Sequence, residues 1–195
     1  SSRPLHMMDR IVFDIETKNS FADVGGEQNL RDLQASVVGL YSYNQDKYFC
    51  FEEHEFDQLI DFFKKTHLLV GFSSKRFDVP VLEKYFNFNL SAIRHFDILE
   101  EVEKNFGRRI GLGALAEANL GIGKTGKGLE AIDLYRNGEI AKLKSYCLQD
   151  VKITKEIYEL IKNRGYLLIP QRNLPQMIKL PISYKEELPA QASLI

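Results

Sequence analysis

Cysteine is scarce in this 195-residue chain, where it occurs only at Cys50 and Cys147. Two such distant cysteines form neither the spacing of a structural metal site nor a disulfide framework. We therefore expect free thiols in a reducing compartment, which predicts a cytoplasmic location. Apolar runs of membrane-spanning length and a signal-peptide pattern are also missing, so a membrane protein and a secreted protein are not expected.

An excess of one charge is missing too. The 26 basic residues nearly balance the 27 acidic residues, and the formal net charge is −1. This balance argues against a protein that coats nucleic acid through bulk positive charge. Internal repeats are also absent. The length and the hydrophobic fraction of 44% instead predict one globular domain with a sizeable core.

Proline is concentrated at one end of the chain, where four of the six prolines follow residue 169. Residues 170–195 therefore cannot continue the preceding helix. They are predicted to form an extended arm, a linker, or a tail that packs on the body. At the other end, residues 1–8 (SSRPLHMM) look like an expression scar, so the domain is predicted to span residues 9–169.

Hydrophobic periodicity predicts alternating strands and helices. Strands are predicted at residues 10–15, 37–43, 47–51, 68–72 and 93–98, the second and third joined as a hairpin by the turn residues 44–46. Helices are predicted at residues 55–65, 78–85, 112–120, 129–135 and 139–163. This order indicates an α/β fold whose mixed sheet has an antiparallel hairpin edge, parallel strands beyond it, and flanking helices.

Two acidic motifs lie near predicted strands. Asp14 and Glu16 are two apart on the first strand, so their side chains point to the same face. Two such carboxylates repel each other unless a cation lies between them, although a strand that ends in a polar loop also explains them. Asp78 opens a helix directly after a buried strand, where the helix dipole alone would favour a carboxylate.

A third acidic position lies on the long final helix. Tyr146 and Asp150 are four residues apart, so they share one face of that helix. Asp150 borders the apolar stripe of the helix, and a carboxylate at the edge of a buried face needs a partner. A metal ion would supply that partner; an ion pair with Lys142 or Lys144 is the alternative.

These motifs together resemble the DEDD superfamily of 3′→5′ exonucleases, in the branch with a tyrosine in the third motif. The resemblance is carried by residues 13–17 (FDIET), 71–80 (GFSSKRFDVP) and 146–150 (YCLQD), and it spans roughly residues 10–163. The second motif is close to the form found in proofreading domains of family B DNA polymerases. Ser145 stands where the other branch of the superfamily carries a histidine. The resemblance implies a ribonuclease H-like fold.

The resemblance also implies an activity and its cofactors. The expected enzyme hydrolyses phosphodiester bonds from the 3′ end of a strand, releases 5′-mononucleotides, and uses two Mg²⁺ or Mn²⁺ ions. Metal binding is assigned to Asp14, Glu16, Asp78 and Asp150, and the Tyr146 hydroxyl is expected to orient the attacking water. Hard divalent cations prefer oxygen ligands, which agrees with a set of carboxylates.

Substrate contacts are assigned by the same resemblance to Thr17, Ser73 and Phe77. Family members usually carry an asparagine where Ser73 stands, so we expect a weaker or differently placed strand contact there. A basic stretch offers contacts to phosphate, with a solvated surface loop as the alternative. Its residues are Lys104, Arg108, Arg109, Lys124 and Lys127.

The expected partner is a nucleic-acid strand with a free 3′ end; single-stranded DNA is favoured and RNA stays open. A protein partner of the arm at residues 170–195 also stays open. Three alternatives compete with this hypothesis. A non-catalytic binding module usually lacks one of the carboxylates, and an endonuclease of the ribonuclease H class does not require the Tyr-x-x-x-Asp helix. An accessory exonuclease domain of a larger polymerase or helicase-like protein would perform the same chemistry.

Overall fold

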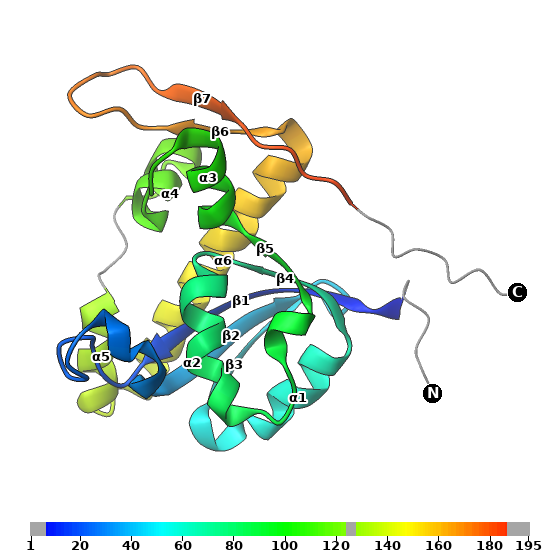
Figure 1. Ribbon diagram of the computed structural model, residues 1–195, viewed down its shortest axis with the longest axis vertical. Helices are drawn as coiled ribbons and strands as arrows, with labels where there is room; N and C mark the ends of the chain where they lie inside the picture. The colour runs from blue at the N-terminus through cyan, green and yellow to red at the C-terminus, as the bar shows by residue number, and fades with distance from the viewer. Residues whose placement is uncertain (1–6, 124–127, 187–195) are drawn as a thin grey trace, which may run out of the picture.

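The computed structural model describes residues 7–123 and 128–186 (Figure 1). Five strands form a mixed sheet in the order β3-β2-β1-β4-β5. Pairing is antiparallel between β1 and β2 and between β2 and β3, and parallel between β1 and β4 and between β4 and β5. The predicted mixed sheet with a hairpin edge is therefore confirmed. The strands are β1 (Asp9–Thr17), β2 (Ala35–Ser42), β3 (Lys47–Glu52), β4 (Thr66–Gly71) and β5 (Arg94–Asp97).

The central strand β1 is covered on both faces. Ile11, Phe13 and Ile15 pack into the hydrophobic cluster on one face, and Val12 packs into the cluster on the other. Because side chains alternate along a strand, the even-numbered residues that follow Val12 share its face. β1 therefore directs the two carboxylates of the first motif toward the helix that covers the Val12 face.

That helix is α6 (Ile140–Arg164), which buries Val151, Ile157 and Ile161 against the sheet. It runs from α5, beside the C-terminal end of β1, to the far end of the molecule (Figure 1). The opposite face of the sheet is covered by α1 and α2, which bury Leu59 and Leu82. The other described helices are α1 (Asp57–Lys64), α2 (Val79–Leu82), α3 (Ile98–Phe106), α4 (Leu112–Leu120) and α5 (Gly128–Arg136).

The single helix predicted at residues 78–85 is divided in the structure. A π-helical turn (Ser74–Asp78) precedes α2, and a 3₁₀ turn (Glu83–Tyr85) follows it. The turn begins after Ser73, whose backbone is left-handed (φ 58°). α3, in contrast, was not predicted at all; it is capped by Asp97, whose side chain accepts hydrogen bonds from the first backbone N–H groups of the helix.

A hairpin follows α6. β6 (Tyr166–Ile169) pairs antiparallel with β7 (Ile178–Pro181), and Leu180 and Ile182 are buried in the same hydrophobic cluster as α6. The domain boundary predicted after Ile169 lies inside this hairpin, because β6 ends at Ile169 and its partner β7 begins at Ile178. The segment after the hairpin loop packs on the body through Leu180 and Ile182, whereas residues 172–177 are exposed. The remainder of the predicted scar and arm, residues 1–6 and 187–195, lies outside the described residues.

The far end of the packed segment is held by polar contacts. The Tyr158 hydroxyl donates a hydrogen bond to the Tyr184 hydroxyl (2.7 Å), and Glu186 forms ion pairs with Arg10 and Lys162. These contacts join the end of the described chain to the start of β1 and to α6. In the described part of the chain, no helix is both long enough and apolar enough to cross a membrane.

Candidate active site

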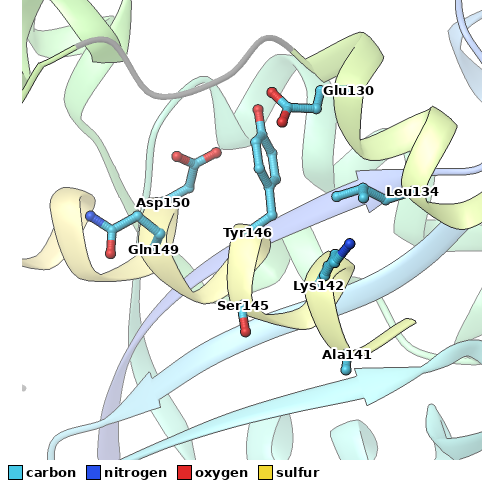
Figure 2. Close-up of a pocket in the computed structure, with 8 residues that line it drawn as sticks. All are labelled: Glu130, Leu134, Ala141, Lys142, Ser145, Tyr146, Gln149 and Asp150. Carbon is cyan, nitrogen blue, oxygen red and sulfur yellow. The ribbon is translucent and has the colours of Figure 1, made fainter. Parts of the chain in front are cut away.

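The first and third motifs meet where α6 crosses the C-terminal end of β1. Asp14 and Glu16 point toward α6, and a register shift follows Glu16 as the strand leaves the sheet. Tyr146 and Asp150 rise from one side of α6, as their four-residue spacing predicts (Figure 2). Together these side chains border a central cavity of about 240 Å³, which is also lined by Ile15, Leu112, Gly113 and Gly128.

Asp78 approaches the same carboxylates from β4. This strand lies beside β1, and the π-helical turn that follows it ends at Asp78. Asp78 is only 2% exposed, and its Oδ2 has no hydrogen-bond partner among the described residues. Its negative charge raises the pKa of both Asp14 and Glu16, so it lies close enough to interact with them. The second motif therefore contributes to the same site.

Burial raises the pKa of every carboxyl group in the set, and neighbouring negative charges add to the effect for Asp14, Glu16 and Asp78. Burial raises the pKa of Asp14 well above its usual range, and the charges of Glu16, Asp78 and Asp150 add to this effect. Burial followed by the charges of Asp150 and Asp78 raises the pKa of Glu16 to about 9. Burial raises the pKa of Asp150 to about 6, and burial with the nearby Asp97 raises that of Asp78. The site therefore disfavours its own ionisation.

This arrangement fits a divalent cation. The carboxylates supply oxygen ligands, and the buried Asp78 oxygen has no other partner in the described structure. A bound cation would favour the ionised carboxylates and so reverse the unfavourable pKa shifts. The lysines considered as partners of Asp150 are engaged elsewhere: Lys142 pairs with Glu139 (2.6 Å) and Lys144 with Glu52 (3.2 Å).

Tyr146 is half-buried at the junction of two cavities. Burial, and then the charges of Asp150, Glu16 and other acids, raises the pKa of its phenol above its usual range. The hydroxyl is therefore neutral near pH 7 and is suited to hydrogen bonding rather than to proton abstraction. Beyond it lies a second cavity of about 570 Å³ between α5 and α6, with Glu130 and Gln149 among its lining residues (Figure 2).

A third cavity of about 480 Å³ adjoins the central one on the side of Glu16. Thr17 and Phe77 line it, together with apolar residues from the β1–β2 loop and α5: Phe21, Ala22, Leu33, Leu129 and Ile132. The rings of Phe77 and Phe21 meet edge to face, with centroids 5.9 Å apart. The structure thus brings two of the three predicted substrate residues to one apolar cavity beside the carboxylates.

The third predicted substrate residue, Ser73, does not line any of these three cavities. Its N–H donates to Asp97 Oδ1 (2.9 Å), and its hydroxyl lies 3.5 Å from Arg109 Nη2. Of the predicted basic stretch, Arg109 is paired with Glu103, and Lys104 lines a separate cavity. Lys124 and Lys127 lie outside the described residues.

Two residues near the site were missed by the sequence analysis. Cys147 was treated as an inert thiol, but its Sγ and the carboxylate oxygens of Asp14 and Glu16 all lie within 4.8 Å of one another. Its place between Tyr146 and Asp150 in the third motif was the available signal. Asp97 was placed only within the strand predicted at residues 93–98, yet it accepts hydrogen bonds from the segment that carries Asp78.

Comparison with known proteins identifies the family. The model of the RNase_H superfamily matches residues 11–162, so the chain belongs to this superfamily. The fold is similar to that of the family B DNA polymerase from the hyperthermophilic archaeon Pyrobaculum calidifontis, with a TM-score of 0.59 and 19% sequence identity. That similarity covers 80% of this chain and 24% of the polymerase chain. No curated protein sequence matches the chain. The protein is thus ribonuclease H-like with a nuclease-type fold, as the motifs predicted.

Proposed function

We propose that this protein is a metal-dependent 3′→5′ exonuclease that releases 5′-mononucleotides from a nucleic-acid strand. The observation that carries the proposal is the convergence of three separate motifs on one site. β1, the turn after β4, and α6 together contribute four buried or half-buried carboxyl groups whose pKa values are all raised. Such a set is stabilised by divalent cations, which also stabilise the charge that develops during hydrolysis of a phosphodiester.

Each side chain has a role in this proposal. Asp14, Glu16 and Asp150 hold cations from the β1–α6 side of the site, and Asp78 holds them from the β4 side. Two Mg²⁺ or Mn²⁺ ions bound there would stabilise the charge that develops on the attacking and leaving oxygens. Tyr146 orients the attacking water through a hydrogen bond, since its neutral phenol is a poor base.

The adjoining cavities support a path for a single strand. The apolar cavity shares Ile15, Glu16 and Gly128 with the central cavity, and the α5–α6 cavity shares Tyr146 and Asp150 with it. We infer that the terminal base enters the apolar cavity, against Phe77. Its apolar lining suits the face of an unpaired base. A single strand is therefore the favoured substrate; the resemblance of the second motif to polymerase proofreading domains favours DNA, with RNA as the second candidate.

Digestion of end-labelled oligonucleotides tests the proposal. Matched single-stranded and duplex DNA and RNA, labelled at either end, are incubated with Mg²⁺, with Mn²⁺, or with excess chelator. We expect release of a 3′ label as a mononucleotide and stepwise shortening of the 5′-labelled strand, both only with metal. Asp14→Ala and Asp150→Ala serve as inactive controls. Hydrolysis that survives chelation, or release of the 5′ nucleotide first, would refute the assignment.

The same digestion, with a circular single strand added, separates the endonuclease and the non-catalytic module from the proposed enzyme. An endonuclease produces internal fragments from a circular single strand, which an exonuclease leaves intact. A non-catalytic module binds the strand and leaves every label in place. An accessory domain of a larger protein gives the same products as the proposed enzyme; in support of that context, the similar polymerase chain is matched over only 24% of its length.

A further inference from the structure

We propose that Cys147, Asp14 and Glu16 form a binding site for thiophilic divalent cations such as Zn²⁺. This site overlaps the carboxylate site, so a thiophilic ion bound there competes with Mg²⁺ or Mn²⁺. The inhibitory effect on hydrolysis rests on the proposed function, whereas the binding of the ion does not.

The positions of the ligand atoms carry this inference. Cys147 Sγ and one oxygen from each of Asp14 and Glu16 all lie within 4.8 Å of one another. Around a tetrahedral zinc ion, with Zn–S of about 2.3 Å and Zn–O of about 2.0 Å, sulfur and oxygen ligands are separated by roughly 3.5 Å. The separations of at most 4.8 Å would therefore have to shorten by no more than about 1.3 Å (4.8 − 3.5) to reach that spacing.

The backbone of the sheet explains why a thiol lies so close to the carboxylates. Asp14 of β1 pairs with Gly39 of β2, and Gly39 pairs with Cys50 of β3. A Cβ atom at Gly39 would lie 2.9 Å from Cys147 Sγ. The absence of a side chain at Gly39 therefore lets α6 bring this sulfur down onto the sheet, where it lies 3.6 Å from the Asp14 carbonyl oxygen.

A second observation points independently to a missing cation. Asp78 Oδ2 is buried without a hydrogen-bond partner, and the charge of Asp78 acts on both Asp14 and Glu16. No lysine or arginine among the described residues forms an ion pair with any of the four site carboxylates. Within the described part of the chain, no basic side chain therefore compensates the ionised cluster, and bound cations would do so.

The chemistry of the ligand determines which metal ions the Cys147 sulfur coordinates. Thiolates favour Zn²⁺ and other thiophilic ions, whereas Mg²⁺ is bound through oxygen and keeps much of its water. When the ion binds, a metal–sulfur bond forms and the thiol proton passes to solvent, with no change in oxidation state. Because Cys147 is fully buried, the thiophilic ion would sit behind the carboxylates and occupy the oxygens of Asp14 and Glu16.

Cobalt spectroscopy tests the site without any nucleic acid. Co²⁺ is added to the metal-free full chain, and the near-ultraviolet sulfur-to-cobalt charge-transfer band is recorded. We expect the band in the parent and in Cys50→Ala, which removes the hydrogen-bonded neighbour of Cys147 and leaves the ligand itself in place. The band should be lost in Cys147→Ala and in Cys147→Ser; the serine variant is included in case alanine impairs folding. Glu16→Gln should weaken Co²⁺ binding at least tenfold. Circular dichroism confirms that each variant is folded.

Competition between Zn²⁺ and Mn²⁺ then tests whether an ion bound at Cys147 inhibits hydrolysis. In an assay with Mn²⁺, the Zn²⁺ concentration for half-inhibition should rise at least tenfold in Cys147→Ser and should stay near the parent value in Cys50→Ala. Absence of the cobalt band in the parent overturns the inference, as does a band that requires Cys50 and is indifferent to Glu16. If the cobalt band appears but the protein hydrolyses no nucleic acid, only the proposed function is refuted. If the protein hydrolyses nucleic acid but shows no cobalt band, only the cysteine site is refuted.

Discussion

Glu16 combines deep burial with three acidic neighbours, and its pKa rises from 4.5 to about 9. Between these pH values the unfolded chain releases the proton of this carboxyl group while the native state keeps it. The free energy of unfolding of the metal-free protein therefore falls as the pH rises through this range. A neutral side chain of the same shape removes this loss.

We predict that Glu16→Gln melts higher than the parent at pH 8 in chelator, by roughly 2–8 °C, and that the difference shrinks at pH 5. With saturating Mn²⁺ the order should reverse, because the parent binds the ion more tightly and gains more stability. Differential scanning calorimetry at both pH values measures these shifts. A metal-free variant that melts below the parent at pH 8 would show that Glu16 has a structural role instead.

Tyr146→Phe isolates the hydroxyl, because the ring and its packing remain. We predict a fall in kcat of about 10²-fold, with near-parent affinity for a single strand and a near-parent melting temperature. Single-turnover cleavage measures the first quantity, and fluorescence anisotropy with Ca²⁺ in place of Mg²⁺ measures the second. Tyr48→Phe is the matched control, since Tyr48 lines none of the three cavities. Equal rates for parent and Tyr146→Phe would exclude the positioning role.

For individual residues, the sequence could predict the positions that follow the regular spacing of a strand or a helix. Asp14 and Glu16 on a strand, and Tyr146 and Asp150 on a helix, follow fixed periodicities, so their shared faces could be derived. The closeness of Cys147 to Asp14 could not be derived from spacing, because it depends on a glycine in a neighbouring strand. The register that aligns Gly39 with Asp14 is a tertiary property, and a single sequence does not contain it.

Among the elements, the π-helical turn (Ser74–Asp78) is held in place by a carboxylate that is distant in the sequence. Asp97 accepts hydrogen bonds from the N–H groups of Ser73 (2.9 Å) and Lys75 (3.2 Å), and from those of Leu99 (3.0 Å) and Glu100 (3.3 Å). It is only 4% exposed. One side chain thus ties the segment that carries Asp78 to the start of α3.

We predict that Asp97→Ala weakens Mn²⁺ binding about tenfold, since Asp78 loses its support, and lowers stability by about 1 kcal/mol through the lost cap. Electron paramagnetic resonance of free Mn²⁺ measures the affinity, and thermal melts measure the stability. The control is Asn89→Ala, which removes the cap of a separate 3₁₀ turn. If Asp97→Ala melts lower but binds Mn²⁺ like the parent, Asp97 only caps the helix.

The sheet was easier to predict than the elements that pack around it. All five of its strands were predicted close to their observed bounds, because each is a short β-prone run between turn residues. β6 and β7 were missed because their surroundings are rich in proline, which left an extended arm, a linker and a packed tail as alternatives without indicating strands. Their pairing is stabilised by packing of β6 on α4 and α6 and of β7 on α3, a tertiary effect that overrides local propensity.

For the molecule as a whole, the packed segment after Ile169 matters for stability. It contributes the buried residues Leu180 and Ile182 and the hydrogen-bonded Tyr184. Burial of two such aliphatic side chains stabilises a fold by roughly 3–6 kcal/mol. We predict that truncation after Ile169 lowers the melting temperature by more than about 5 °C and reduces the soluble yield.

Truncation after Glu186 is the control, because it leaves all of these contacts in place. Thermal melts of both truncated proteins beside the full chain make the comparison. An unchanged melting temperature after truncation at Ile169 would mean that the hairpin and the segment after it add nothing to the stability of the body.

The placement of the carboxylates also has a consequence for biosynthesis. β1 supplies Asp14 early in the chain, whereas α6 supplies Asp150 late. Synthesis proceeds from the N-terminus, so β1 is free to pair with β2 and β4 long before α6 is made. No nascent chain that ends before α6 holds the full set of ligands. Under the proposed function, the enzyme would therefore stay inactive until α6 has been made, while the nascent chain is still close to the messenger RNA that encodes it.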